Sequence, residues 1–305
     1  MTALDSSEQA RAAGFQFGPE LAQLTVVLLW SSTFVVAKAA FAQLSPLAFI
    51  FARFLLMIVL AFTVLLLRRR GAERAVERSD WGRLLLAGLT GYTLYQLGFV
   101  LGLDRTSPFS SSLLIAMTPL FTLIILAVLG EPTSRLAWLG LVVALVGVVI
   151  FLLDKRDVAT GTMVGDLLSI GAAMAFALYG VVTRPLVRKY PTETYTAWSV
   201  LAGAVPLLLV SLPAAIAQPW VALSTDVWLS IVYLAIFPVY IAYILWNWAI
   251  SRRGIATASS FGLLVPIASG VLSAIFFGEA FGPAKLLGAV LVLAGLGIVR
   301  LRPVR

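Results

Sequence analysis

The chain has 305 residues, of which 61% are hydrophobic and only 12% are charged, and its mean hydropathy is +1.00. A soluble fold needs a charged exterior, so this composition excludes soluble enzymes, nucleic-acid-binding domains and disordered chains. An outer-membrane β-barrel is also excluded, because its strands alternate polar and apolar residues whereas the apolar runs here are continuous. We expect an all-α polytopic membrane protein whose partners are the lipid bilayer and a small-molecule substrate, with no nucleic acid.

The apolar runs follow one another with short polar connections. Residues 1–20 are polar and mixed in charge and are predicted to form a cytoplasmic tail. A bilayer-spanning helix needs about 20 residues. On this basis the predicted spans are residues 21–41, 46–67, 81–103, 107–129, 136–153, 164–182, 192–216, 227–248, 255–277 and 284–301. The predicted organisation is a first group of five helices (residues 21–153), an external connection (154–163) and a second group of five (164–305).

The basic residues indicate how the helices are oriented. The chain has 22 Lys and Arg residues and a net charge of +8. Most of them fall in the connections on one side of the bilayer. If the number of spans is even, both termini lie on that same side. Because basic residues concentrate in cytoplasmic loops, we expect both termini to be cytoplasmic and the protein to lie in a bacterial inner membrane. A monomer is compatible with this architecture.

The absence of cysteine and histidine narrows the chemistry. Disulfides, thiolate metal sites, cysteine nucleophiles and imidazole bases are excluded. We expect no catalytic residue, no metal site and no cofactor. A membrane-embedded enzyme stays a remote alternative: Ser111 and Asp166 are present, but no histidine or mid-span lysine base accompanies them.

An internal repeat relates the two groups of helices. At an offset of 148 residues the matching pairs are Gly130 and Gly278, Glu131 and Glu279, Gly140 and Gly288, Gly147 and Gly295, Ser111 and Ser259, Tyr92 and Tyr240, and Tyr95 and Tyr243. Isolated glycine matches mean little in a membrane protein, but matches across several consecutive spans indicate a duplication. Because five is odd, the second copy enters from the opposite side, which predicts an inverted-topology repeat with a substrate site between the halves.

The order of the short motifs is similar to that of a known family. The motifs are Leu29-Trp30-Ser31-Ser32-Thr33-Phe34 ending at Lys38, Ser45-Pro46 leading to Arg53, Thr118-Pro119-Leu120, and the two Gly-Glu pairs, each followed by two glycines. With them the chain after residue 20 resembles the EamA-type transporters of the drug/metabolite transporter superfamily. The resemblance implies ten helices in two halves and export of small metabolites, often amino acids and with aromatic ones favoured.

Two helical faces carry the main candidate site residues. Polar groups inside the hydrocarbon are costly and usually face a pathway or a partner. Helical spacing places Tyr92, Tyr95, Gln96 and Phe99 on one face of the third span, and Tyr240, Tyr243 and Asn247, with Trp246 beside them, on one face of the eighth. We predict that both faces line a substrate pathway. The alternatives are an interfacial aromatic belt or ordinary helix packing.

Further candidates come from the first and sixth spans and from two prolines. Trp30 and Ser31, and Tyr179 in the matching region, are predicted pathway residues, although membrane hydroxyls often bond their own backbone. Pro119 and Pro266 each remove a helical hydrogen bond, so they are candidate gating kinks or elements that only shape the bundle.

The charged residues near the spans have competing interpretations. Arg53 is the only charge inside the second span: it binds a substrate carboxylate, or, as the position favours, it reaches toward the outer surface in a structural role. Glu131 and Glu279 are predicted to cap helices or to pair with basic loop residues.

The predicted function is export of amino acids, aromatic or other neutral ones, by alternating access. No Asp or Glu lies in the middle of a predicted span. Because cation-coupled antiporters usually need a buried carboxylate, we expect a facilitator driven by the substrate gradient. Nucleotide sugars, sugar phosphates or drugs are alternative substrates on the same scaffold, and phosphorylated solutes rank lower because they need several basic residues. A channel would need a filter or charged ring, and none is visible.

Overall fold

The computed structural model describes residues 18–67, 76–153, 162–242, 245–246, 248–249 and 261–300. These residues form helices joined by turns, and no β-strand occurs among them. Seven helical segments are long and apolar enough to cross a bilayer, and shorter apolar helices cover Thr225–Val239, Leu264–Phe277 and Pro283–Val299. The protein is therefore an all-helical, multi-pass membrane protein, and the count of ten spans stays a prediction.

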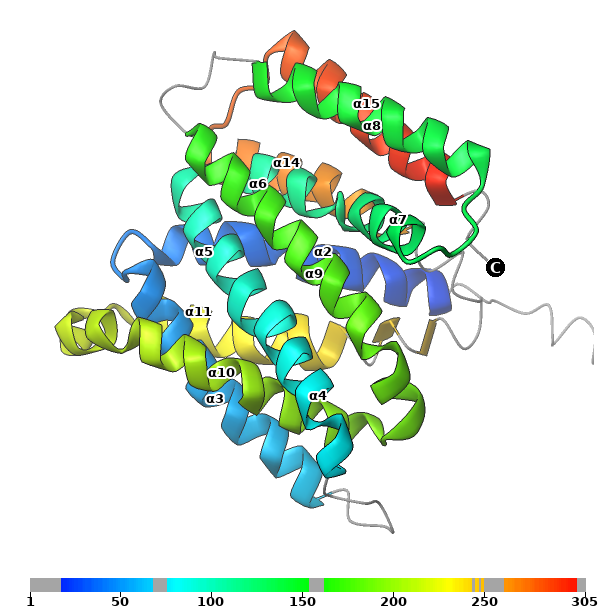
Figure 1. The fold of residues 1–305 in the computed structure, drawn as a ribbon. Helices are drawn as coiled ribbons and strands as arrows, with labels where there is room; N and C mark the ends of the chain where they lie inside the picture. The colour runs from blue at the N-terminus through cyan, green and yellow to red at the C-terminus, as the bar shows by residue number, and fades with distance from the viewer. Residues whose placement is uncertain are drawn as a thin grey trace, which may run out of the picture.

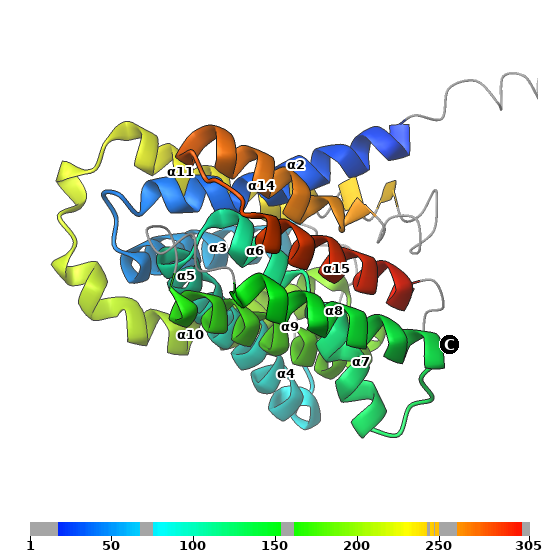
Figure 2. The same ribbon diagram turned by 90° about the horizontal axis from the view of Figure 1, so that it is seen from above.

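The helices follow the predicted order (Figures 1 and 2). The first half contains α2 (Gly18–Ala40), α3 (Pro46–Leu67), η1 (Arg78–Asp80), α4 (Trp81–Gly88), η2 (Leu89–Leu94), α5 (Tyr95–Arg105), α6 (Pro108–Ile115), α7 (Thr118–Val128) and α8 (Arg135–Leu153). The second half contains α9 (Met163–Lys189), α10 (Thr192–Ala217), η4 (Trp220–Ala222), α11 (Thr225–Ile236), η5 (Phe237–Ile241), α14 (Leu264–Phe277) and α15 (Pro283–Arg300).

Local sequence fixes several helix ends. Ser107 caps α6 by accepting a hydrogen bond from the backbone N–H of Ser110, with Pro108 at the first helical position. Gly130 and Gly278, which follow α7 and end α14, have φ angles of 80° and 64°. This left-handed conformation is easily reached only by glycine. The Gly-Glu pairs found by sequence matching therefore mark the same helix-ending turn in both halves.

Helix α9 extends beyond the sixth predicted span. Hydropathy ends it at Val182, where polar residues begin, whereas α9 continues to Lys189. The extra turns are held by ion pairs: the Arg184 guanidinium lies 2.9 Å from the Glu131 carboxylate, and the Lys189 ammonium lies 2.7 Å from that of Asp80. Because these pairs bind charged residues to other elements, the helix extends beyond its apolar part.

Both proline candidates follow an interruption of a helix. Residues 116–117 form a turn between α6 and α7, and Pro119 is the second residue of α7. Residues 262–263 form a turn before α14, and Pro266 is the third residue of that helix. Proline is tolerated in a first helical turn because its missing N–H would be unsatisfied there anyway. The breaks are observed, and a gating role for them stays a prediction.

The last helix of each half packs against the other along one edge of the bundle (Figures 1 and 2). A β-carbon at Gly140 would lie 2.6 Å from the carbonyl oxygen of Gly295, and one at Gly295 would lie 2.5 Å from that of Gly140. Gly147 and Gly288 approach equally closely, at 2.8 and 2.7 Å. Since Gly140 corresponds to Gly288 and Gly147 to Gly295, this antiparallel contact maps onto itself under the sequence repeat, as a two-fold interface does.

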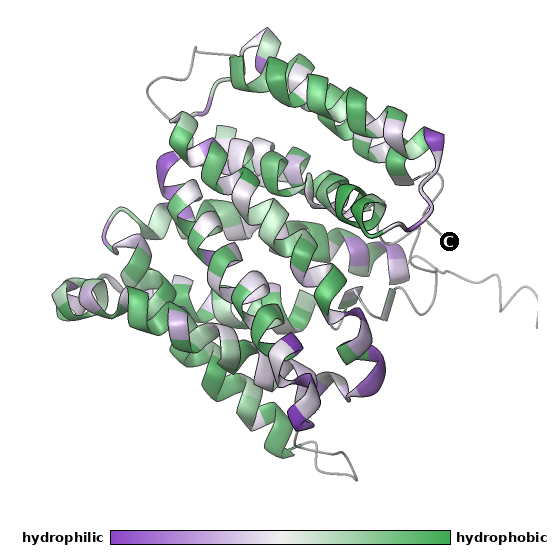
Figure 3. Cartoon of the chain, in the orientation of Figure 1, coloured by the Kyte–Doolittle hydropathy of each residue, from purple (hydrophilic) through white to green (hydrophobic). Residues whose placement is uncertain are grey.

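Apolar residues cover the outside of the helices as well as their contacts. On α8, Leu139, Val142, Val146 and Val149 follow helical spacing, and each is at least half exposed. Figure 3 shows hydrophobic residues along most of the helices and hydrophilic ones gathered near their ends. Such an apolar exterior is stable in lipid and would aggregate in water.

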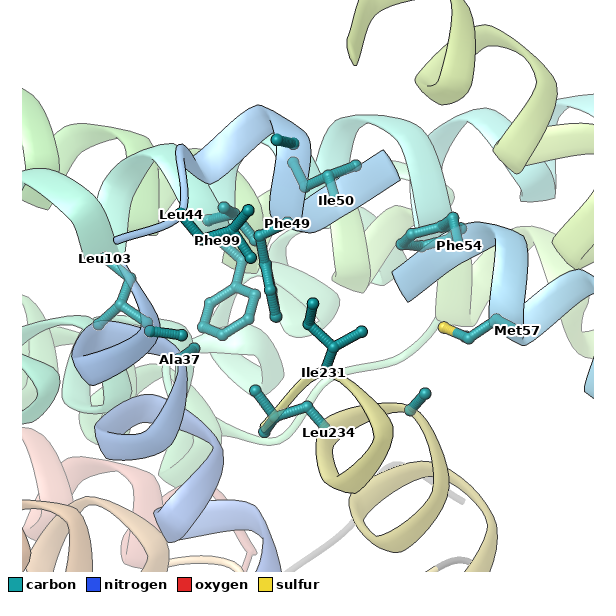
Figure 4. Packing of buried hydrophobic residues seen from close by; sticks show 14 of the residues in the cluster. Ala37, Leu44, Phe49, Ile50, Phe54, Met57, Phe99, Leu103, Ile231 and Leu234 are labelled. Atoms are coloured by element: carbon teal, nitrogen blue, oxygen red, sulfur yellow. The ribbon is translucent and has the colours of Figure 1, made fainter. Parts of the chain in front are cut away.

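The largest buried cluster joins both halves of the chain. Phe49 and Phe54 of α3, Phe99 of α5, and Ile231 and Leu234 of α11 pack into it (Figure 4). Each of these side chains is at most 3% exposed. The predicted pathway residue Phe99 therefore lies in the packed interior and at the contact between the halves.

Candidate functional site

Two π-helical segments mark the same position in each half. The span from Arg78 to Arg105 is a single helix whose middle, η2, is π-helical, and η5 continues α11 in the same way. η2 begins at Leu89 and η5 at Phe237, positions related by the 148-residue repeat offset. π-helical turns are rare and occur often at functional sites, because they contain an extra residue and free backbone groups from regular bonding. The candidate site is built around these two segments.

Each π-helical segment packs against the first helix of the opposite half. Helix α9 lies on η2, where a β-carbon at Gly91 would collide with the ring of Tyr179. Helix α2 lies on η5, where the Trp30 indole N–H donates to the carbonyl oxygen of Pro238 at 3.1 Å. In each contact, the π-helical segment of one half packs against the first helix of the other half. The two contacts are therefore arranged symmetrically, although their residues differ.

An aromatic cluster forms on the η2 side. The ring of Tyr92 lies 5.8 Å from that of Tyr179, and the ring of Tyr95 lies 4.8 Å from that of Phe176 and 6.1 Å from that of Phe99. These separations are those of favourable aromatic pairs. The structure therefore brings Tyr92, Tyr95 and Phe99 of the third predicted span together with Tyr179 of the sixth.

Fewer predicted residues can be located on the η5 side. The rings of Trp30 and Trp246 lie 5.1 Å apart, which joins α2 to the helical residues after η5. Tyr240 belongs to η5, but its side chain lies outside the described part of the structure. Tyr243 and Asn247 lie outside the described residues, and their pathway roles stay predictions.

Ser31 forms its hydrogen bonds with backbone carbonyl groups. It is fully buried, and its hydroxyl donates to the carbonyl oxygens of Val27 at 2.6 Å and Val265 at 3.1 Å. The first is a bond within α2 and the second joins α2 to α14. These bonds fit the alternative raised for membrane hydroxyls, in which the serine hydroxyl bonds to backbone carbonyl groups.

Gln96 and Arg53 form the polar part of the cluster. Gln96 is 7% exposed, and its side-chain carbonyl accepts a hydrogen bond from Arg53 Nη1 at 3.4 Å. Arg53 is 5% exposed, so the expectation that it reaches the outer surface is wrong. The physical reason is that α5 and its neighbours cover this part of α3.

The two glutamates related by the repeat offset each pair with a basic residue, as the sequence predicted, but both partners lie in helices, α9 and α15, and not in loops. Glu131 pairs with Arg184 at the surface. Glu279 is buried with Lys285, whose ammonium lies 2.9 Å from the carboxylate, and Ser107 and Ser273 donate to the same carboxylate. Lys285 lies within about 6 Å of three phenylalanine rings, those of Phe109, Phe151 and Phe281.

Sequence reasoning missed two residues of the cluster, Phe176 and Tyr195. Phe176 lies one helical turn before Tyr179, so helical spacing from Tyr179 would have indicated it. The Tyr195 hydroxyl donates to that of Tyr179 at 2.5 Å. Tyr195 lies in the first turn of α10, and no sequence pattern linked it to Tyr179. Arg53 was considered and judged structural. No group of three or more Asp or Glu side chains suited to a metal ion occurs in the described part of the chain.

Known proteins are similar to this chain over nearly its whole length. The chain is 27% identical to "Uncharacterized transporter YyaM" of Bacillus subtilis (strain 168), over 88% of this chain and 90% of that protein. It is 26% identical to "Probable amino-acid metabolite efflux pump" of Salmonella typhimurium (90% and 92%), and 29% identical to "Probable terminal-alkyne amino-acid exporter" of Streptantibioticus cattleyicolor (76% and 77%).

A fold relative and a family assignment agree with these similarities. A protein crystal structure matches with a TM-score of 0.62 at 23% identity, over 93% of this chain and 96% of that one, which shows a common fold. The EamA-like transporter family matches twice, over residues 19–153 and again over residues 163–301. The chain therefore belongs to the EamA-like transporter family, and it is a transporter of the drug/metabolite type.

Proposed function

We propose that this transporter exports amino acids, with aromatic or other neutral ones favoured, by alternating access between two inverted five-helix halves. The observation that carries the proposal is the matched pair of π-helical segments, each packed against the first helix of the other half. A substrate held between such segments contacts both halves, so its binding is coupled to their relative movement.

The chemistry of the site supports an amphipathic organic solute. Tyr92, Tyr95, Phe99 and Phe176 offer aromatic surface, and Gln96 offers an amide beside them. Relatives named as amino-acid exporters or efflux pumps support the same substrate class. A phosphorylated solute would favour several basic side chains, whereas among the described residues Arg53 is the basic residue that contacts this cluster.

The proposed energy source is the substrate gradient. The buried carboxylate of Glu279, between α14 and α15, is bound by Lys285 and two serine hydroxyls. The proposed location is a bacterial inner membrane with both termini in the cytoplasm, as the distribution of basic residues predicts.

Removing the aromatic rings from both halves tests the site. The double variant Tyr95→Ala, Tyr243→Ala is expected to reduce uptake of an aromatic amino acid into proteoliposomes about thirtyfold, since each lost ring removes about 1 kcal/mol of contact energy. Insertion into the bilayer should be unchanged. Leu209→Ala, on the exposed surface of α10, is the control. Full transport by the double variant would refute the pathway.

A further inference from the structure

Arg53 is a buried cation that sits beside the aromatic cluster. Of the 22 residues of α3 it is the only charged one, and it lies seven positions, or about 10 Å, from the helix start. Its side chain is enclosed, with 5% of the residue exposed. A charged group held at such a depth is costly unless it has a partner or a function.

The described residues leave the guanidinium incompletely bonded. A guanidinium has five N–H donors. One of them reaches Gln96 at the long distance of 3.4 Å, and the Nε atom is buried without a hydrogen-bond partner. The ring of Phe49 lies 5.9 Å from the guanidinium carbon and adds a cation–π contact. No carboxylate within ion-pair distance of Arg53 occurs in the described part of the chain, so no acidic side chain there compensates its charge.

The second half of the chain shows that the fold does not require this charge. Helix α10 corresponds to α3 in the repeat and packs along it, and it contains no Lys or Arg. A cation needed only for packing two equivalent helices would be expected on both. Arg53 instead breaks the symmetry at one place, next to Gln96 and the rings of the cluster. A solute bound there would be oriented by a single charged anchor.

We propose that Arg53 binds the carboxylate of the transported solute. The side chain of the bound amino acid is then directed toward the rings of Tyr95 and Phe99. The planar guanidinium forms two parallel hydrogen bonds to a carboxylate, which lysine cannot reproduce. Gln96 then orients the guanidinium and is a positioning residue. This inference rests on the proposed amino-acid export and specifies which part of the substrate is recognised.

Calorimetric titration of the purified full-length protein in detergent tests the proposal with three ligands. Phenylalanine has a carboxylate and an ammonium, phenylalaninamide lacks the carboxylate, and 3-phenylpropanoate lacks the ammonium. We expect the wild-type protein to bind phenylalanine at least about tenfold more tightly than phenylalaninamide. In Arg53→Gln this preference should disappear, with the affinity for phenylalaninamide unchanged. Arg184→Gln, which removes an exposed arginine on α9, should keep the preference.

Two results overturn the proposal: a wild-type protein without the preference, or Arg53→Gln retaining it. If Arg53→Gln does not fold, Arg53→Lys is measured instead, because lysine keeps the charge but lacks the planar guanidinium. Unchanged affinity of Arg53→Lys for phenylalanine would overturn the proposal, and a several-fold loss of affinity would support it. Wild-type binding of 3-phenylpropanoate alone, lost in the variant, supports the Arg53 site and contradicts amino-acid export. Binding of none of the three ligands contradicts both.

Discussion

Glu131 and Glu279 occupy equivalent positions after a left-handed glycine, yet their carboxylates lie in opposite environments. The side chain of Glu131 is 39% exposed and that of Glu279 is 1% exposed, and each has a basic partner 2.9 Å away. An exposed pair is screened by water and contributes little, whereas a buried pair leaves an uncompensated charge when one partner is removed. The same residue in the same turn therefore has different energetic importance in the two halves.

This difference is directly measurable. Glu279→Gln is expected to lower the free energy of unfolding by about 3 kcal/mol, because Lys285 stays charged and enclosed by three phenylalanine rings. Glu131→Gln should lower it by less than about 1 kcal/mol. Chemical denaturation of both variants in the same detergent compares them. Equal effects would contradict the burial of the Glu279 pair.

At the scale of helices, the contact between α8 and α15 depends on the absence of side chains. At Gly140, Gly147, Gly288 and Gly295 an added β-carbon would lie within 3 Å of the partner backbone, which cannot move without separating the helices. Close backbone approach over small residues is a main source of helix association in lipid. The glycines matched by the sequence repeat are thus the residues at which the two helices come closest.

Two glycines of α15 provide a matched test of that contact. Gly295→Ala is expected to lower the unfolding midpoint, corresponding to about 1–3 kcal/mol of overpacking. Gly297→Ala, two residues further along, adds a methyl group with no atom within 4 Å and should be neutral or slightly stabilising. Thermal unfolding in detergent reports both. A neutral Gly295→Ala would contradict the close approach of the two helices.

Helix positions were largely predictable from hydropathy, whereas the π-helical segments were not. The second span was predicted at residues 46–67, the same bounds as α3, since a continuous apolar run has polar residues at both ends. One extra residue in a helical turn does not change the apolar character of a run, so η2 and η5 left no signal in the sequence pattern. The buried ion pair of Lys285 with Glu279 also follows from no sequence pattern and is recognisable only in three dimensions.

The candidate site was also predictable only in part. Helical spacing predicted Tyr92 and Tyr95 on a face with Gln96, and the structure places the rings of Tyr179 and Phe176 of α9 beside the two tyrosines. Which helices face one another is decided by tertiary packing, so neither the burial of Arg53 nor the bonding of Ser31 to α14 followed from the sequence.

For the whole molecule, the inverted arrangement predicts on which side each connection lies. With both termini in the cytoplasm, Val221, between α10 and α11, lies outside, and Glu131, between α7 and α8, lies inside. The chain has no cysteine, so single cysteines are unambiguous reporters. A membrane-impermeant maleimide should label Val221→Cys in intact cells, and Glu131→Cys only after the cells are permeabilised. Labelling of Glu131→Cys in intact cells would contradict the orientation.

Substrate counterflow in proteoliposomes tests the central claim most directly. Vesicles loaded with unlabelled phenylalanine, at the same pH inside and outside, are expected to accumulate labelled phenylalanine transiently, because a carrier exchanges its substrate without an ion gradient. Loading with a nucleotide sugar or a sugar phosphate should give no accumulation of that solute. Counterflow of a phosphorylated solute in the absence of amino-acid counterflow would contradict the account.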